Sequence, residues 1–150
     1  MATTIAAVFL VAGAAEAGEG KVLRGYLDGG GKARITVTYE HRYGTFVRTT
    51  KWRFQPIQVR CDGDGSEAWL AIAVTGGESI RAEFADRNGF GGGTASGHLH
   101  DPDVKTYVRG DFVTKRKAEG FVRVNGNAVP LEGGGHADCD SGRLHFKATR

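Results

Sequence analysis

The chain has 150 residues, the length of one domain, and 40% of them are hydrophobic, which is enough for a core of its own. Its 24 glycines follow no Gly-X-Y period and only three prolines occur, so the composition indicates many tight turns and excludes a collagen-like or proline-rich chain. The net charge is +3, and basic and acidic residues are interleaved along most of the sequence. We interpret this excess as too mild for a protein that binds nucleic acid.

The first segment has the features of a secretory signal peptide. Residues 5–15 are almost wholly apolar, and the small-residue pattern Ala15-Glu16-Ala17 suits cleavage before Gly18. The apolar run is well short of the roughly 20 residues that a membrane-spanning helix needs. No Lys or Arg precedes it, which departs from the usual signal pattern, and the alternative is an apolar first strand or tail. We expect residues 1–17 to be removed on export and residues 18–150 to form a single secreted β-sandwich domain without a membrane span.

Most of the remaining sequence alternates between apolar and polar residues, which is typical of strands with one buried face. The pattern predicts strands at 22–27, 33–39, 46–60, 68–74, 80–84, 104–112, 120–124 and 144–148. Pro56 changes the phase of the alternation within the third of these strands and predicts a bulge or bend there. Residues 68–74 are apolar throughout, so we expect a central strand that is covered on both faces.

Segments rich in Gly, Asn and Asp separate the predicted strands and indicate turns, because these residues accept positive φ at low cost. They lie at 28–31, 62–65, 76–77, 88–89, 125–126 and 133–135. The basic run 115–117 sits where a hairpin turn is expected, and 88–103 is the longest irregular segment. Together these patterns predict an all-β fold, an antiparallel β-sandwich or jelly-roll-like barrel of about eight strands.

Cys61 and Cys139 are the only cysteines of the chain. In an exported protein, two cysteines are most simply explained by one structural disulfide. Closing so long a loop is worth on the order of 4 kcal/mol in the chain-entropy model. We therefore expect a Cys61–Cys139 disulfide.

Three segments resemble those of a loose group of small exported bacterial proteins of unknown function: 107–112 (YVRGDF), 118–123 (AEGFVR) and 139–148 (CDSGRLHFKA). Members of this group share a cysteine in mid-chain, which Cys61 matches, and a Cys-Ser-Gly-like final hairpin, into which Asp140 inserts one residue here. The resemblance covers the C-terminal third of the chain together with Cys61. It implies a β fold and the same disulfide, and it implies no activity.

Two motifs contain residue types that carry out chemistry in other proteins. His98 and His100, with Asp101 and Asp103 beside them, place two imidazoles and two carboxylates within six residues, which suits metal ligation, although a polar loop explains them equally. The tripeptide at 140–142 matches part of the motif around the nucleophile of chymotrypsin-like serine proteases. We expect no catalytic role for Ser141, because neither the next residue nor any histidine motif completes the match.

Acidic and aromatic residues allow two further binding hypotheses. Residues 62–67 are similar to a calcium loop but lack the glycine and the bidentate glutamate of an EF-hand, so we expect no tight calcium site. Six Trp and Tyr side chains could form a sugar-stacking platform, but most lie within strand patterns, where core or cross-strand packing is expected. They are Tyr26, Tyr39, Tyr43, Trp52, Trp69 and Tyr107.

The sequence therefore predicts a non-catalytic, monomeric binding or structural module at the cell surface or in the medium. Its expected ligand is a carbohydrate or a protein, with no cofactor, no metal and no nucleic acid. The alternative is a small metal-assisted hydrolase that uses His98 and His100.

Overall fold

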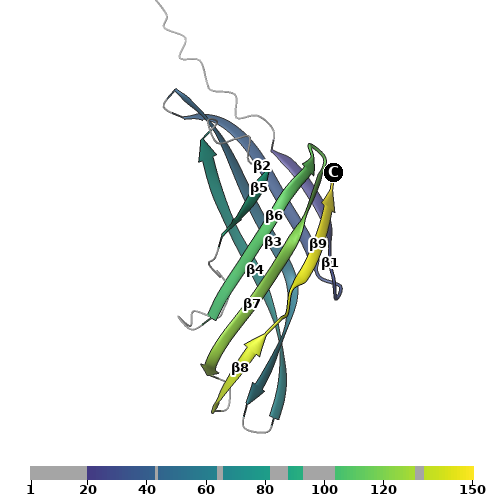
Figure 1. Cartoon of the computed structure of the whole chain (residues 1–150), viewed down its shortest axis with the longest axis vertical. Helices are drawn as coiled ribbons and strands as arrows, with labels where there is room; N and C mark the ends of the chain where they lie inside the picture. Colours follow the sequence, from purple (N-terminus) through teal and green to yellow (C-terminus); the bar gives the residue numbers. More distant parts are fainter. Residues whose placement is uncertain (1–19, 43, 64–65, 82–87, 93–103, 131–133) are drawn as a thin grey trace, which may run out of the picture.

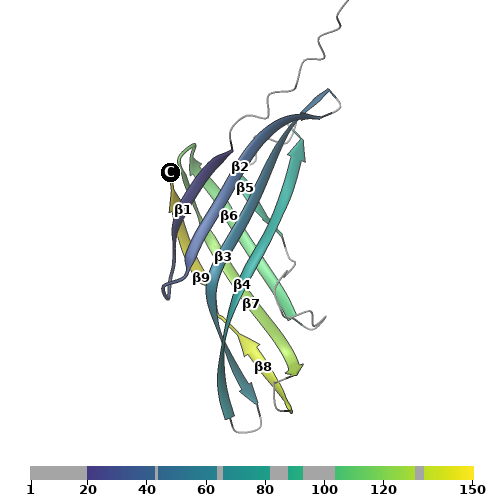
Figure 2. The same ribbon diagram turned by 180° about the vertical axis from the view of Figure 1, so that it is seen from behind.

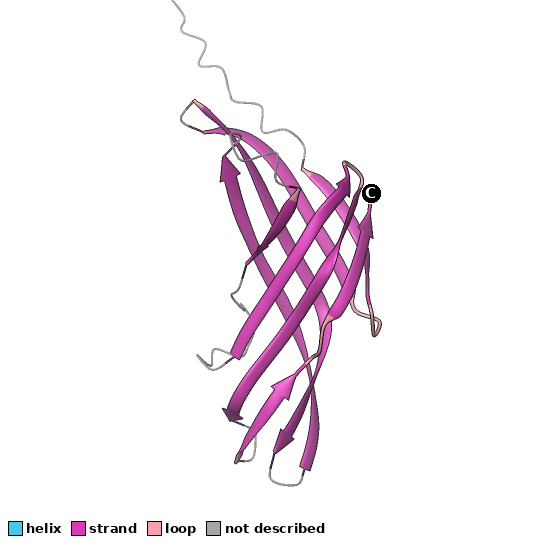
Figure 3. Cartoon of the chain, in the orientation of Figure 1, coloured by secondary structure: helices cyan, strands magenta, loops and turns pink. Residues whose placement is uncertain are grey.

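The computed structural model describes residues 20–42, 44–63, 66–81, 88–92, 104–130 and 134–150. They form nine strands and no helix, which confirms the all-β prediction (Figure 3). The strands are β1 (Lys21–Leu27), β2 (Lys32–Arg42), β3 (Thr45–Gly63), β4 (Ser66–Arg81), β5 (Gly89–Gly92), β6 (Val104–Thr114), β7 (Lys117–Pro130), β8 (His136–Asp140) and β9 (Leu144–Thr149). Within the described ranges, no helix is long and apolar enough to cross a membrane.

All the strand pairs are antiparallel, and six strands close into a barrel. The strands follow the order β4-β3-β2-β1-β9-β7-β6-β5, and β8 pairs with both β3 and β7, which joins the two ends of the β3-β2-β1-β9-β7 segment. Figures 1 and 2 show β1 to β4 as one layer of an elongated molecule and β5 to β9 as the other. β4 and β5 lie at the two free ends of the strand order.

The core fills the space between these layers, because alternate residues of each strand point inward. Phe54 of β3 and Phe146 of β9 are almost fully buried, and their ring centroids are 4.9 Å apart. Phe90 of β5 joins them, with its ring centroid 6.2 Å from that of Phe146. The side chains of the short β5 strand therefore belong to the core.

The predicted bulge at Pro56 is confirmed. The register between β3 and β4 shifts between Phe54 and Ile57. β3 pairs with β2 as far as Gln55, before the shift, and with β8 at residues 60–62, beyond it. The long strand β3 therefore pairs with β2 in its first part and with β8 in its last part. The bulge lies where the pairing with β2 ends.

Two expectations about β4 were wrong. The pair Gly76-Gly77 lies inside β4 and does not end it, and β4 lies at a free end of the strand order instead of at its centre. Trp69 on β4 is 60% exposed, so this strand is not covered on both faces. The apolar composition of 68–74 misled because the outward positions hold the small residues Ala71 and Ala73 and the exposed Trp69. Position 76 holds a glycine because the indole of Trp52 lies against its backbone and leaves no room for a side chain.

The turn expected at Asn125-Gly126 is also absent. Gly126 lies inside β7, where it pairs with Val104 of β6 and with Cys139 of β8. Within the predicted irregular segment 88–103, the described residues 88–92 contain the strand β5. By contrast, the predicted turn at 28–31 is confirmed, with Gly29 and Gly30 at φ values of 88° and 96°, and residues 115–116 form the β6–β7 hairpin turn.

Candidate functional site

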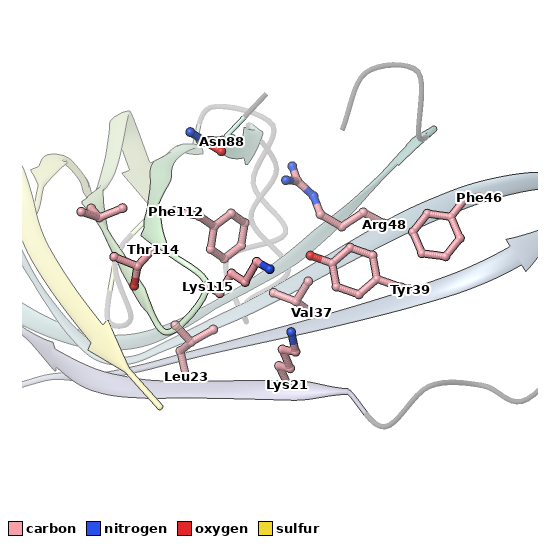
Figure 4. A pocket seen from close by; sticks show the side chains of 11 residues that line it. Lys21, Leu23, Val37, Tyr39, Phe46, Arg48, Asn88, Phe112, Thr114 and Lys115 are labelled. Atoms are coloured by element: carbon pink, nitrogen blue, oxygen red, sulfur yellow. The ribbon is translucent and has the colours of Figure 1, made fainter. Parts of the chain in front are cut away.

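A cavity of about 450 Å³ opens at the end of the barrel opposite β8. It lies between the start of β1, the end of β2 and the start of β3 on one side, and the β6 end of the other layer (Figure 4). Its lining residues are Lys21, Leu23, Val37, Tyr39, Phe46, Arg48, Asn88, Phe112, Val113, Thr114 and Lys115.

The base of the cavity is apolar and continuous with the core. Leu23 of β1 and Val37 of β2 line it and are themselves core residues. The rings of Tyr39 and Phe46 stack with centroids 5.6 Å apart, and Phe112 of β6 lies across from them (Figure 4). This combination offers contact to the flat or aliphatic body of a ligand.

Cationic side chains surround this apolar base. The Lys21 ammonium lies 5.9 Å from the centroid of the Tyr39 ring, and the Arg48 guanidinium lies 5.2 Å from that of Phe112. Lys115, in the β6–β7 turn, completes the set (Figure 4). Among the described lining residues none carries a carboxylate.

Arg48 is also a structural residue of the cavity wall. It is 5% exposed, and its guanidinium donates a hydrogen bond of 3.0 Å to the carbonyl of Gly89, next to the cavity residue Asn88. Glu78 of β4 accepts a hydrogen bond of 3.4 Å from the N–H of Gly91. Burial raises the pKa of Glu78, and the Gly91 N–H and the Arg48 charge oppose that shift. These two side chains link β3 and β4 to β5 across the free ends of the strand order.

The predicted disulfide is present and lies away from this cavity. Cys61 of β3 and Cys139 of β8 are bonded and occupy directly paired positions. Ser141 follows β8, and its hydroxyl accepts a hydrogen bond of 2.9 Å from the Val124 N–H and donates one of 2.9 Å to the carbonyl of Gly142. The Ser141 side chain therefore ties the last turn to β7.

Three described aspartates near the disulfide, Asp62, Asp138 and Asp140, each accept a hydrogen bond. Asp62 accepts a hydrogen bond of 3.2 Å from Arg60, and Asp138 accepts one of 3.0 Å from the backbone N–H of Ala128. Asp140 receives two from the guanidinium of Arg123, which lowers the pKa of that carboxyl. In the described part of the chain, no three His, Cys, Asp or Glu residues are grouped to hold a metal ion. His98 and His100, with Asp101 and Asp103, lie outside it.

The five Trp and Tyr residues of this set that the structure describes do not share one surface. Trp52 is buried in the core and Tyr39 stacks on Phe46, as packing predicts. Tyr26, Trp69 and Tyr107 are exposed instead, on β1, β4 and β6. Two further strands separate β1 from β4, and β6 belongs to the other layer, so these three rings form no common platform. Tyr43 lies outside the described residues.

Sequence reasoning did not identify the barrel-end cavity. Tyr39 and Arg48 occupy paired positions of β2 and β3, and Lys21 pairs with Val37, so register brings them together. The available signal was the alternation that places residue 39 on the same face as residue 37. Comparisons with protein-family models, curated proteins and solved structures find no match for this chain. The function is therefore inferred from the cavity.

Proposed function

We propose that the chain is an extracytoplasmic, monomeric binding protein whose ligand is a small organic anion with an apolar body. The ligand occupies the barrel-end cavity, its apolar part on Leu23 and Val37 and its acidic group near Lys21 and Lys115. The role is non-catalytic binding, as the sequence predicts. This ligand is smaller than the carbohydrate or protein that the sequence analysis expects.

The observation that carries this proposal is the convergence of three cations on an apolar cavity without a carboxylate among its described lining residues. An anion that leaves water loses hydration free energy unless charged or polar groups replace the water. Lys21 and Lys115 supply that replacement, and the guanidinium of Arg48, which also donates to the Gly89 carbonyl, adds to the positive potential of the cavity. The cavity therefore favours anions over neutral molecules of the same shape.

The size of the cavity sets the class of ligand. Its volume of about 450 Å³ lies in the range that holds a small organic molecule. Tyr39, Phe46 and Phe112 favour an aromatic or aliphatic body over a fully hydrated sugar. The disulfide and the signal-like segment 1–17 support the extracytoplasmic setting.

Two fluorescent probes of nearly equal shape test the proposal with the full chain. 8-Anilino-1-naphthalenesulfonate carries an anionic group, and N-phenyl-1-naphthylamine has the same aromatic body without it. We expect the anionic probe to bind with one site per chain and at least about tenfold more tightly than the neutral probe, a difference of about 1.4 kcal/mol. Titration of the fluorescence measures both affinities.

Variants assign the binding to the cavity. Lys21→Gln combined with Lys115→Gln should weaken the anionic probe by about tenfold or more and leave the neutral probe within about twofold. Lys105→Gln combined with Arg109→Gln, on the exposed face of β6, removes the same charge elsewhere and should change neither. Equal affinity for the two probes, or equal losses in the two double variants, would refute the proposal.

A further inference from the structure

A second cationic surface lies on the outer face of β1, β2 and β3, the layer seen from outside in Figure 2. Arg24 of β1 pairs directly with Arg34 of β2, and Arg34 pairs directly with Arg53 of β3. All three side chains are exposed. Because neighbouring strands lie about 4.8 Å apart, the three arginines form a continuous row across the sheet.

A second row continues the pattern two residues further along each strand, about 6.7 Å away. Lys32 of β2 pairs with Tyr26 of β1 on one side and with Gln55 of β3 on the other. Tyr26 is 70% exposed. The two rows together line a surface hollow of about 410 Å³, which is separate from the barrel-end cavity and shares no lining residue with it.

The arginine row is not neutralised by the rest of the described chain. Within the described ranges, Arg24, Arg34 and Arg53 form no ion pair with a carboxylate. Arg53 donates a hydrogen bond of 2.8 Å to the side-chain oxygen of Gln55, which is uncharged. Like charges at directly paired positions of a sheet are unfavourable for folding. A local cost without compensation inside the fold is expected at a functional site.

We propose that this surface, defined by Arg24, Arg34, Arg53, Lys32 and Tyr26, binds an anionic polysaccharide through its carboxylate or sulfate groups. Guanidinium groups bind such oxyanions with two parallel hydrogen bonds. A polysaccharide with one acidic group on each sugar presents anions at a spacing comparable to that of the strands. The exposed ring of Tyr26 supplies a flat apolar surface for the face of a sugar.

The geometry favours a polysaccharide over nucleic acid. Proteins that bind single strands stack successive bases on several aromatic rings, and this surface has Tyr26 alone among its described lining residues. Recognition of a duplex places a helix or a two-stranded ribbon in a groove, whereas these residues lie on the face of a barrel wall. The extracytoplasmic setting that we propose above also exposes the chain to polysaccharides.

Binding of four polymers to the full chain tests this inference by calorimetry or by surface immobilisation. The probes are a heparin oligosaccharide, an oligogalacturonate, neutral dextran and an oligothymidylate. We expect the two anionic glycans to bind with affinities that fall as salt rises, because salt screens the contacts of arginine with sulfate and carboxylate groups. Dextran should not bind. Binding of the oligothymidylate as tight as that of both glycans would overturn the proposal.

Charge-neutralising variants locate the site. The arginine triple variant, which combines Arg24→Gln, Arg34→Gln and Arg53→Gln, should weaken glycan binding by about tenfold or more. The matched control removes three exposed charges from other positions, by Arg81→Gln, Lys105→Gln and Arg109→Gln, and should keep binding within about twofold. Among single variants Arg34→Gln should have the largest effect, because Arg34 lies between the other two.

Two further measurements make the result decisive. The arginine triple variant should melt at the same temperature as the wild type or higher, because it removes like-charge neighbours. Lys21→Gln combined with Lys115→Gln should leave glycan binding unchanged, so failure of the barrel-end proposal is distinguishable from failure of this one. Unchanged glycan binding in the folded triple variant, or an equal loss in its matched control, would refute the polysaccharide site.

Discussion

The indole of Trp52 lies directly over the backbone of Gly76, its paired residue on β4. A Cβ atom placed on Gly76 would lie 2.6 Å from the indole nitrogen. The same ring also lies near Gly92 of β5, where an added Cβ would make an ordinary 3.9 Å contact. Trp52 thus fills the space between β4 and β5, the two free ends of the strand order.

Gly76→Ala should therefore destabilise the fold by about 1–3 kcal/mol, because the buried indole must shift in a packed core. Gly92→Ala is the matched control and should change the free energy of unfolding by less than about 1 kcal/mol. Urea denaturation followed by Trp fluorescence measures both. Equal effects of the two variants would contradict the asymmetric contact.

Loss of the disulfide should weaken barrel closure. Cys61 and Cys139 are 78 residues apart in sequence and join β3 to the short strand β8. Replacement of both by serine should lower the free energy of unfolding by about 4 kcal/mol on the chain-entropy model. Denaturation with and without a reductant checks this, since the reductant should destabilise the wild type and leave the double variant unchanged.

Glu78 should make the fold less stable as pH rises. Burial raises its pKa above the ordinary value of 4.5, and its Oε1 has no hydrogen-bond partner among the described residues. The stability linked to its neutral form is fully present below pH 4.5 and is lost as pH rises through the folded pKa. Glu78→Gln should therefore be more stable than the wild type at about pH 7 and equal to it at about pH 3.5.

Glu119 should change the pH dependence of stability in the opposite direction to Glu78. Its hydrogen bond with Lys117 lowers its pKa below the ordinary value of 4.5. Stability from this pair is present above that value and is lost as pH falls through the folded pKa. Glu119→Gln should be slightly less stable than the wild type at about pH 7. A Glu78→Gln variant that behaved in the same way as Glu119→Gln would contradict the burial argument.

Calcium bound to the acidic residues beside the disulfide should not strongly stabilise the fold. Arg60 and Arg123 already pair with Asp62 and Asp140, and a cation would have to displace them. Thermal melts with EDTA and with a few millimolar calcium should give nearly equal midpoints. A large upward shift with calcium that Asp62→Asn combined with Asp140→Asn abolishes would show a metal site.

Export should remove residues 1–17. The apolar segment 5–15 and the pattern Ala15-Glu16-Ala17 are the basis for this expectation. The intact mass of the secreted protein should correspond to a chain that begins at Gly18. Recovery of chains that retain Met1 from the culture medium would exclude cleavage at this position.

Local patterns predicted most of the strands, because alternation along a strand depends only on which residues of that strand point inward. They missed the short strands β5 and β8, and they divided β4 between two predicted strands at 68–74 and 80–84. The segment around Ile35, the bend at Pro56 and the hairpin at Lys115 were all predicted in this way. Glycine pairs were a weaker guide. Gly76 allows close packing against Trp52, and Gly126 lies between two paired strands. The sequence alone does not distinguish either role from that of a glycine in a turn.

Only the tertiary structure shows the two candidate sites, because each depends on the register between strands. That register cannot be derived from residues that are neighbours in the sequence. The row of Arg24, Arg34 and Arg53 shows the reason most clearly. In sequence each arginine lies between apolar residues or glycine, and the three are far apart along the chain, so the sequence does not show that they form one row. Alternation turns the neighbouring residues inward, and antiparallel pairing then places like charges side by side. The sequence by itself determined which faces are wet, and strand pairing determined which charges meet on them.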